Sequence, residues 1–256
     1  MKILLTALAL VAGLSSLSGA ARAADLTVFT GGSMAEPLRV AAEDFTRATG
    51  NRVIFVMGTT GVITGKVRAG EASDIVVISA EGLMALQKDG LIAPGPPTPL
   101  ARAIIGAAVR KGAPKPDIST TDSFKAALVA APSVAYPDPG QGATAGIYLA
   151  GLFDRLGVGP AVAAKARLRP NGKETAAAVS SGDAALGLTF ISELRPDPGV
   201  EVVAALPAAL QSPTLYAAAV SARAADAGLA RAFIAFITSL AERPRLVAAG
   251  VEPAAP

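Results

Sequence analysis

The sequence predicts an α/β protein of two lobes, each a mostly parallel sheet flanked by helices. Strand-like apolar runs alternate with helix-like segments along the chain, as parallel sheets require. The run at 74–79 is nearly all apolar, as expected for a strand covered on both faces. The Pro-rich stretch at 94–99 separates two blocks of this alternation, so each block predicts one lobe.

The first block predicts three strand–helix units. Its strands are expected at 26–29, 52–56 and 74–79, and its helices from near Pro37 to Gly50, at 62–69 and at 81–88. In the first helix, apolar residues from Leu38 to Phe45 follow the spacing i, i+3, i+4, i+7. Pro37 suits the first turn of a helix and Gly50 suits its end. The stretch at 94–99 is not expected in a central strand.

The second block repeats the alternation. Its strands are expected at 134–136 and 185–191, and its helices at 124–131, between Thr144 and Gly157, and at 173–180. A long strand at 103–109 suits a crossing out of the first lobe, and strands at 201–205 and 216–220 suit a return, before a last helix at 229–240. The first lobe is then discontinuous, with residues 24–103 and 206–256, and the second lobe contains residues 104–205.

The N-terminal residues predict export. Lys2 precedes an apolar run at 3–17, and Ala21-Arg22-Ala23 fits the small-x-small pattern of a signal-peptide cleavage site. The run is short for a membrane-spanning helix, which needs about 20 residues. We expect a signal peptide at 1–23, cleavage after Ala23 and a periplasmic mature protein that begins at Ala24.

Composition excludes several kinds of chemistry. The chain has 23 basic and 20 acidic residues, and removal of Lys2 and Arg22 leaves 21 against 20, so charge favours neither nucleic acid nor a membrane surface. It has no His, which excludes a Ser-His-Asp triad and a His-based zinc site, and no Cys. We therefore expect no metal, no cofactor and no enzymatic activity. Asp74, Asp138 and Glu193 lie near strand ends, and we interpret each as a cap or turn residue.

Three segments combine small residues, hydroxyls and the start of a helix. They are 30–33, 58–61 and 142–145. A helix N-terminus presents free backbone N–H groups and a partial positive charge. Glycine lets a ligand approach the backbone closely, and Ser or Thr adds a neutral donor. These turns predict a site for a small anion that needs no Arg or Lys.

Several segments resemble the periplasmic molybdate-binding proteins. The segments are 28–38, 45–50, 58–61, 72–80 and 180–188, and Gly-Thr-Thr-Gly at 58–61 is similar to a Gly-Ser-Ser-Gly turn of that family. The resemblance implies a two-lobed periplasmic binding protein fold of type II. It also implies a monomer that binds a small anionic ligand between the lobes, with the permease of an ABC importer as partner.

The resemblance also points to individual site residues. In the first lobe these residues are Gly32, Ser33 and Thr60 or its neighbour Thr59. In the second lobe they are the backbone at Ala143 and Thr144, a further contact at Thr175, and Phe190.

Two readings of the ligand remain open. Phe190 departs from the Tyr that family members usually have, and Phe cannot donate a hydrogen bond. A molybdate- or tungstate-like oxyanion suits a neutral cage of N–H and O–H groups. A di- or tricarboxylate usually requires a cation, which Lys173 could supply. Two other classes of protein compete with a binding protein: an enzyme, and the effector domain of a regulator. The export signal disfavours the regulator.

Overall fold

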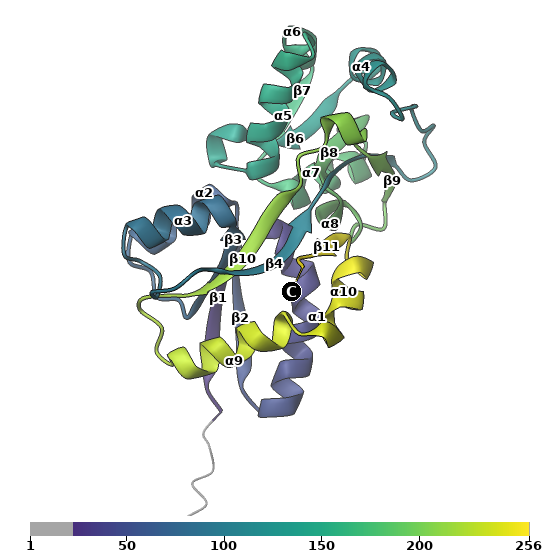
Figure 1. Cartoon of the computed structure of the whole chain (residues 1–256). Helices are drawn as coiled ribbons and strands as arrows, with labels where there is room; N and C mark the ends of the chain where they lie inside the picture. Colours follow the sequence, from purple (N-terminus) through teal and green to yellow (C-terminus); the bar gives the residue numbers. More distant parts are fainter. Residues whose placement is uncertain (1–22, 256) are drawn as a thin grey trace, which may run out of the picture.

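The computed structural model describes residues 23–255, which form two lobes (Figure 1). The predicted signal peptide lies almost wholly outside these residues. Within 23–255, no helix is both long and apolar enough to cross a membrane.

The first lobe is built on a six-stranded sheet in the order β11-β4-β10-β3-β1-β2. The strands are β1 (Asp25–Gly31), β2 (Arg52–Gly58), β3 (Ile75–Ser79), β4 (Thr98–Ala103), β10 (Thr214–Val220) and β11 (Val251–Pro253). β1 pairs in parallel with β2 and β3, whereas β10 and β11 form antiparallel pairs. Both ends of the chain therefore contribute to one sheet.

Helices cover both faces of this sheet. They are α1 (Gly32–Thr49), α2 (Thr60–Arg68), α3 (Ala80–Lys88), α9 (Ala227–Ile237), η3 (Leu240–Glu242) and α10 (Arg243–Ala248). Val77 packs in the apolar cluster that contains α1 and α9, while its neighbours Val76 and Ile78 pack in the cluster of α2 and α3. Alternate side chains of β3 thus enter two cores, which explains why this strand is apolar throughout.

The second lobe contains a five-stranded sheet in the order β7-β6-β8-β5-β9. Its strands are β5 (Ile105–Arg110), β6 (Val134–Pro137), β7 (Ala166–Arg169), β8 (Leu186–Phe190) and β9 (Val200–Ala205). Its helices are α4 (Thr121–Ala130), η1 (Pro139–Gln141), α5 (Thr144–Arg155), α6 (Gly159–Ala163), α7 (Gly172–Ser181) and α8 (Ile191–Leu194). β6 is parallel to β7 and β8, and β5 is antiparallel to its neighbours.

The chain crosses between the lobes twice. The first crossing is short, because β4 ends at Ala103 and β5 begins at Ile105. The second runs from β9 through η2 (Ala208–Leu210) to β10. The two crossings are joined by Gln211, whose amide accepts from the backbone N–H of Ile105 at 3.0 Å and donates to its carbonyl at 2.9 Å.

The predicted α/β fold of two lobes is confirmed, with three local differences. Both sheets are mixed rather than mostly parallel, since the strands next to the crossings run antiparallel to their neighbours. The run 103–109 is divided between β4 and β5. Pro99 lies within β4, at a register shift opposite Ala217, where a missing N–H is tolerated.

Candidate functional site

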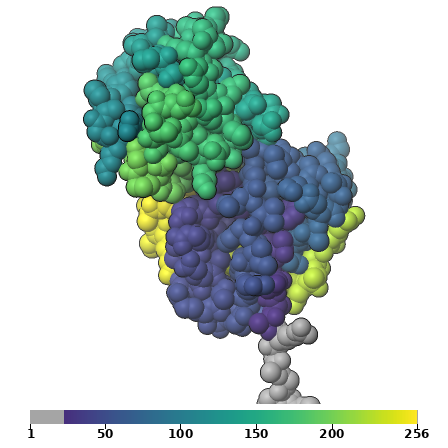
Figure 2. All heavy atoms as spheres, turned by 180° about the vertical axis from the view of Figure 1, so that it is seen from behind, coloured from purple at the N-terminus to yellow at the C-terminus, as the bar shows by residue number. Residues whose placement is uncertain are grey.

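A small cavity lies where the two lobes meet. In Figure 2 the teal and green second lobe rests directly on the purple and blue first lobe. The residues that line the cavity come from both lobes: Gly31, Gly32, Gly58, Thr59, Thr60, Pro137, Ala143, Thr144, Ala145, Asn171, Gly172, Phe190, Glu193 and Tyr216.

Four helices begin at this cavity. α1 and α2 start there from the first lobe, and α5 and α7 from the second. No side chain caps α1 at Gly31 or α5 at Ala143 within the described residues, so their first N–H groups stay available. Thr59 caps α2 by accepting from Val62, and Asn171 caps α7 by accepting from Glu174. Among residues 23–255, no Arg or Lys side chain lines the cavity. Its positive potential therefore comes from helix termini.

The two lobes are closed over the cavity. The backbone N–H of Gly61 donates to the carbonyl of Gly142 at 3.1 Å. The Thr59 hydroxyl donates to the carbonyl of Gln141 at 2.5 Å, and the Thr144 hydroxyl donates to that of Thr60 at 3.2 Å. A Cβ on Gly61 would stand 2.7 Å from the Cα of Gly142, which is closer than real Cβ contacts. Glycine at both positions is what lets the backbones touch.

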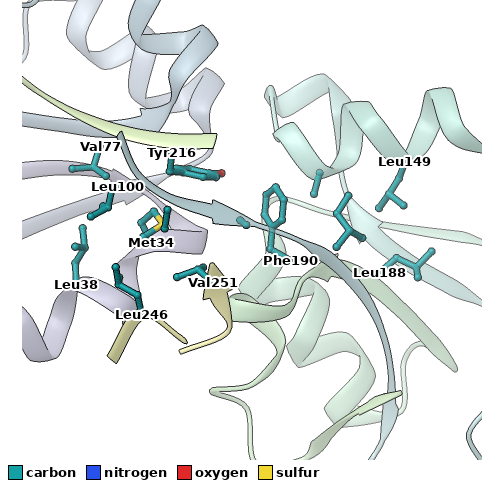
Figure 3. Packing of buried hydrophobic residues seen from close by; sticks show 14 of the residues in the cluster. Met34, Leu38, Val77, Leu100, Leu149, Leu188, Phe190, Tyr216, Leu246 and Val251 are labelled. Atoms are coloured by element: carbon teal, nitrogen blue, oxygen red, sulfur yellow. The ribbon is translucent and has the colours of Figure 1, made fainter. Parts of the chain in front are cut away.

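Tyr216 supplies a hydroxyl that the sequence analysis did not assign to the site. Its ring meets that of Phe190 edge to face, with centroids 6.0 Å apart, and Figure 3 shows the two rings facing each other from opposite lobes. Burial raises the pKa of the Tyr216 phenol, although the nearby hydroxyls of Ser33, Thr144 and Thr60 act against it. The phenol is therefore neutral at physiological pH and is able to donate. Tyr216 from the first lobe thus provides a hydroxyl where Phe190 has none.

Glu193 brings a carboxyl group into the same cavity. Its Oε2 accepts from the Thr189 hydroxyl at 2.6 Å. A Cβ on Gly32 would lie 2.7 Å from Oε1, and one on Gly172 would overlap Oε2. The carboxyl therefore lies between the starts of α1 and α7. Burial raises the pKa of Glu193 to about 7, although hydrogen bonds from the Thr189 hydroxyl and from the backbone of Phe190 and Gly172 lower it.

Glu193 thus has the capping role that we expected, since its carboxyl accepts from the backbone of Phe190 and Gly172 at two helix starts, and it also lines the cavity. The other two acids have the structural roles that we expected. Asp74 accepts from the backbone N–H of Thr27 at 2.7 Å and of Ala225 at 2.8 Å, and Asp138 accepts from Gly140 at 2.8 Å. All three acids lie near the end of a strand, so their positions in the sequence did not distinguish Glu193 from the other two.

Most of the site residues named from the resemblance lie at the cavity. Those that line it are Gly32, Thr59, Thr60, Ala143, Thr144 and Phe190. Ser33 lies in the first turn of α1, and its buried hydroxyl has no hydrogen-bond partner among the described residues. Thr175 does not line the cavity, because it is fully buried and its hydroxyl donates to the Asn171 carbonyl at 3.0 Å.

A wider groove adjoins the cavity and shares Gly32, Gly58, Asn171 and Glu193 with it. Lys173 is exposed and lines this groove rather than the cavity. Glu193 thus borders both the cavity and the groove. Within residues 23–255, no group of three or more acidic side chains could hold a metal ion.

Comparison with known proteins establishes the family. The model of the bacterial extracellular solute-binding proteins matches residues 26–252. The chain belongs to this family. It is a periplasmic-type solute-binding protein of the kind that serves ABC importers, as the resemblance implied.

Individual relatives differ in what they are named for. An aconitate isomerase from Pseudomonas sp. is 33% identical over 234 residues, which cover 89% of this chain and 87% of the relative. The structure of the Azotobacter vinelandii periplasmic molybdate-binding protein has a TM-score of 0.74 at 19% identity, covering 90% of this chain and 99% of that one. The sulfate-binding protein of Mycobacterium tuberculosis has a TM-score of 0.72 at 21% identity, covering 91% and 88%. The two structures share the fold.

Proposed function

We propose that this protein captures a small organic acid, a di- or tricarboxylate, between its lobes and delivers it to the permease of an ABC importer. The observation that carries this proposal is the make-up of the cavity. Four helix N-termini and several neutral hydroxyls surround it, together with one carboxyl group and an apolar wall.

Helix N-termini favour an anion as the ligand. All four bring a partial positive charge to one volume, and the starts of α1 and α5 also offer N–H donors that no side chain caps. The hydroxyls of Thr60, Thr144 and Tyr216 add donors in a site largely closed to solvent, where a hydrogen bond to a charged group contributes about 1.5–3 kcal/mol. A ligand without negative charge would leave this donor set poorly matched.

The apolar wall and Glu193 favour a carboxylate over a tetrahedral oxyanion. Pro137, Ala143, Ala145 and Phe190 line the cavity with carbon, which suits the carbon body of an organic acid. Burial raises the pKa of Glu193 to about 7, so in its protonated form the carboxyl is able to donate a hydrogen bond to a bound carboxylate. Two carboxyl groups at close range commonly share one proton in this way. The adjoining groove with Lys173 provides room and a cation for further carboxylates.

The aconitate isomerase supports the same ligand class. Its name indicates that it acts on a tricarboxylate, and it matches this chain at 33% identity along most of both chains. The second candidate is a molybdate- or sulfate-like oxyanion, which is favoured by the named ligands of the two structural neighbours and by the small size of the closed cavity.

A ligand panel separates the two candidates. Thermal unfolding and isothermal titration would be run with trans-aconitate, cis-aconitate, citrate, molybdate, tungstate and sulfate. A ligand present at about 100 times its Kd stabilises the folded state by about 2.7 kcal/mol. We expect this shift with at least one tricarboxylate. Binding of molybdate without binding of any carboxylate would contradict the proposal.

Delivery to an importer requires export, for which we propose cleavage after Ala23. The intact mass of protein secreted by a cell that expresses the full chain tests this. A mass that retains residues 1–23 would contradict both the cleavage site and the proposed location.

A further inference from the structure

We propose that Glu193 is a catalytic acid–base group and that the protein isomerises an unsaturated polycarboxylate by moving a proton along it. This inference rests on the proposed organic-acid ligand and adds an activity to it. It departs from our expectation that the chain is not an enzyme.

The position of Glu193 is the first argument. Its carboxyl lines a cavity shared by both lobes, and one oxygen, Oε2, is held by the Thr189 hydroxyl at 2.6 Å. The other oxygen, Oε1, lies toward the start of α1. Glu193 forms no salt bridge within the described residues, so no cation there holds it in its ionised form.

The surroundings of Glu193 allow it to exchange protons near neutral pH. Tyr216 is the other titratable group that lines the cavity, and its phenol stays protonated. The groove on the outer side presents Glu36, Lys173, Glu174 and Asp197. Glu193 borders both spaces, so it faces a ligand on one side and lies beside an open groove on the other. A general base works best when its pKa lies near the operating pH.

The reaction is a proton shift that needs no co-reactant. Glu193 Oε1 removes a proton from a methylene group next to the double bond of the ligand, so that the C–H bond breaks and its electron pair forms a dienolate. The protonated Glu193 then returns the proton to the other end of the allylic system. A new C–H bond forms, the double bond has moved, and Glu193 is again a carboxylate. When the ligand rotates about a carbon–carbon single bond and the proton shift then runs in reverse, the cis and trans isomers interconvert.

The helix N-termini suit the charge that develops in this reaction. Removal of the proton adds negative charge to a carboxylate oxygen of the ligand. The uncapped starts of α1 and α5 line the cavity, and their N–H groups are suited to stabilise this charge without reorganisation. The cross-lobe hydrogen bonds at Gly61 and Thr60 limit the access of water while the proton is in transit.

Proton NMR in D₂O tests this inference directly. Purified protein is incubated with trans-aconitate, and deuterium incorporation at the carbon positions and the appearance of the cis isomer are followed. We expect both, with a rate that rises with pH as Glu193 ionises. Binding of trans-aconitate is measured separately by titration. Binding without exchange would overturn the inference and leave the proposed function intact, whereas no binding of any carboxylate would overturn the proposed function itself.

Variants assign the step to Glu193. We expect Glu193→Gln to lower the exchange rate about 100- to 10,000-fold while trans-aconitate still binds. Glu252→Gln removes an exposed carboxylate of β11 that lines neither the cavity nor the groove, and it should leave the rate unchanged. If Glu193→Gln fails to fold by circular dichroism, Glu193→Asp keeps the acid but shortens its reach, and we expect a slower rate with the pH dependence retained. An unchanged rate in either Glu193 variant would overturn the assignment.

Discussion

Replacing Tyr216 with Phe removes one hydroxyl from the cavity and leaves the ring in place. The ring is 3% exposed and packs against Phe190, so the fold loses little with the hydroxyl. In the closed cavity that hydroxyl is a neutral donor, and its hydrogen bond to a charged ligand contributes about 1.5–3 kcal/mol. We therefore expect Tyr216→Phe to weaken binding roughly 10- to 150-fold.

The assay is isothermal titration with the tightest-binding ligand of the panel. Tyr136→Phe is the matched control, because Tyr136 is also buried and packs edge to face against an aromatic ring, Phe153, but does not line the cavity. It should bind like the parent. The double variant Tyr216→Phe/Phe190→Tyr moves the hydroxyl to the facing ring of the other lobe, and we expect it to recover part of the lost affinity.

One result would refute this reasoning. If Tyr216→Phe binds as tightly as the parent, the hydroxyl does not reach the ligand. Tyr216 would then be a packing residue at the junction of the lobes, and the anion would be held by the helix N-termini without it.

Three further predictions concern other groups at the cavity. Burial raises the pKa of Glu193 from 4.5 to about 7, so between these pH values the folded state binds more protons than the unfolded state. The free energy of unfolding should therefore fall by up to about 3 kcal/mol as the pH rises from 4.5 to 7. Chemical denaturation measured across this pH range should show the decrease in the parent and not in Glu193→Gln. Gly61→Ala should hold the lobes apart at Gly142, which X-ray scattering would show as a larger radius of gyration, and it should weaken ligand binding. Gly65→Ala in the same helix is the control, because the added Cβ meets no atom within 4 Å, and this variant should bind normally. Ser33→Ala should weaken binding roughly 10- to 150-fold without lowering the melting temperature, and a lower melting temperature with normal binding would make that hydroxyl structural.

The positions of helices and strands were largely predictable because they depend on neighbours in the sequence. The apolar spacing from Leu38 to Phe45 faces the core of the first lobe, as α1 requires. The start of α1 was placed too late. Its first residue is Gly32, and Pro37 lies inside the helix rather than in its first turn. Gly31 and Gly32 indicated a turn in the sequence, but the strand passes directly into the helix.

Part of the candidate site was also predictable from local sequence. Gly32, Thr60 and Thr144 stand at helix starts that follow strands or tight turns, and such positions are recognisable because the N–H groups of a helix start are free wherever the helix lies. Thr175 was misplaced for the same reason. It also stands near a helix start, but its side chain turns inward to the carbonyl of Asn171.

The sequence by itself determined an α/β chain, its alternation of elements and the helix starts that favour an anion, because each depends on residues close together in the chain. Tertiary structure alone decided which side chains share the cavity. Phe190 and Tyr216 belong to different lobes and meet only when β8 and β10 are brought together. Glu193 resembles Asp74 and Asp138 in the sequence, yet it alone of these three faces the ligand cavity, because α8 directs it between the starts of α1 and α7. Proximity across the chain comes from packing of the whole fold, which no local pattern encodes.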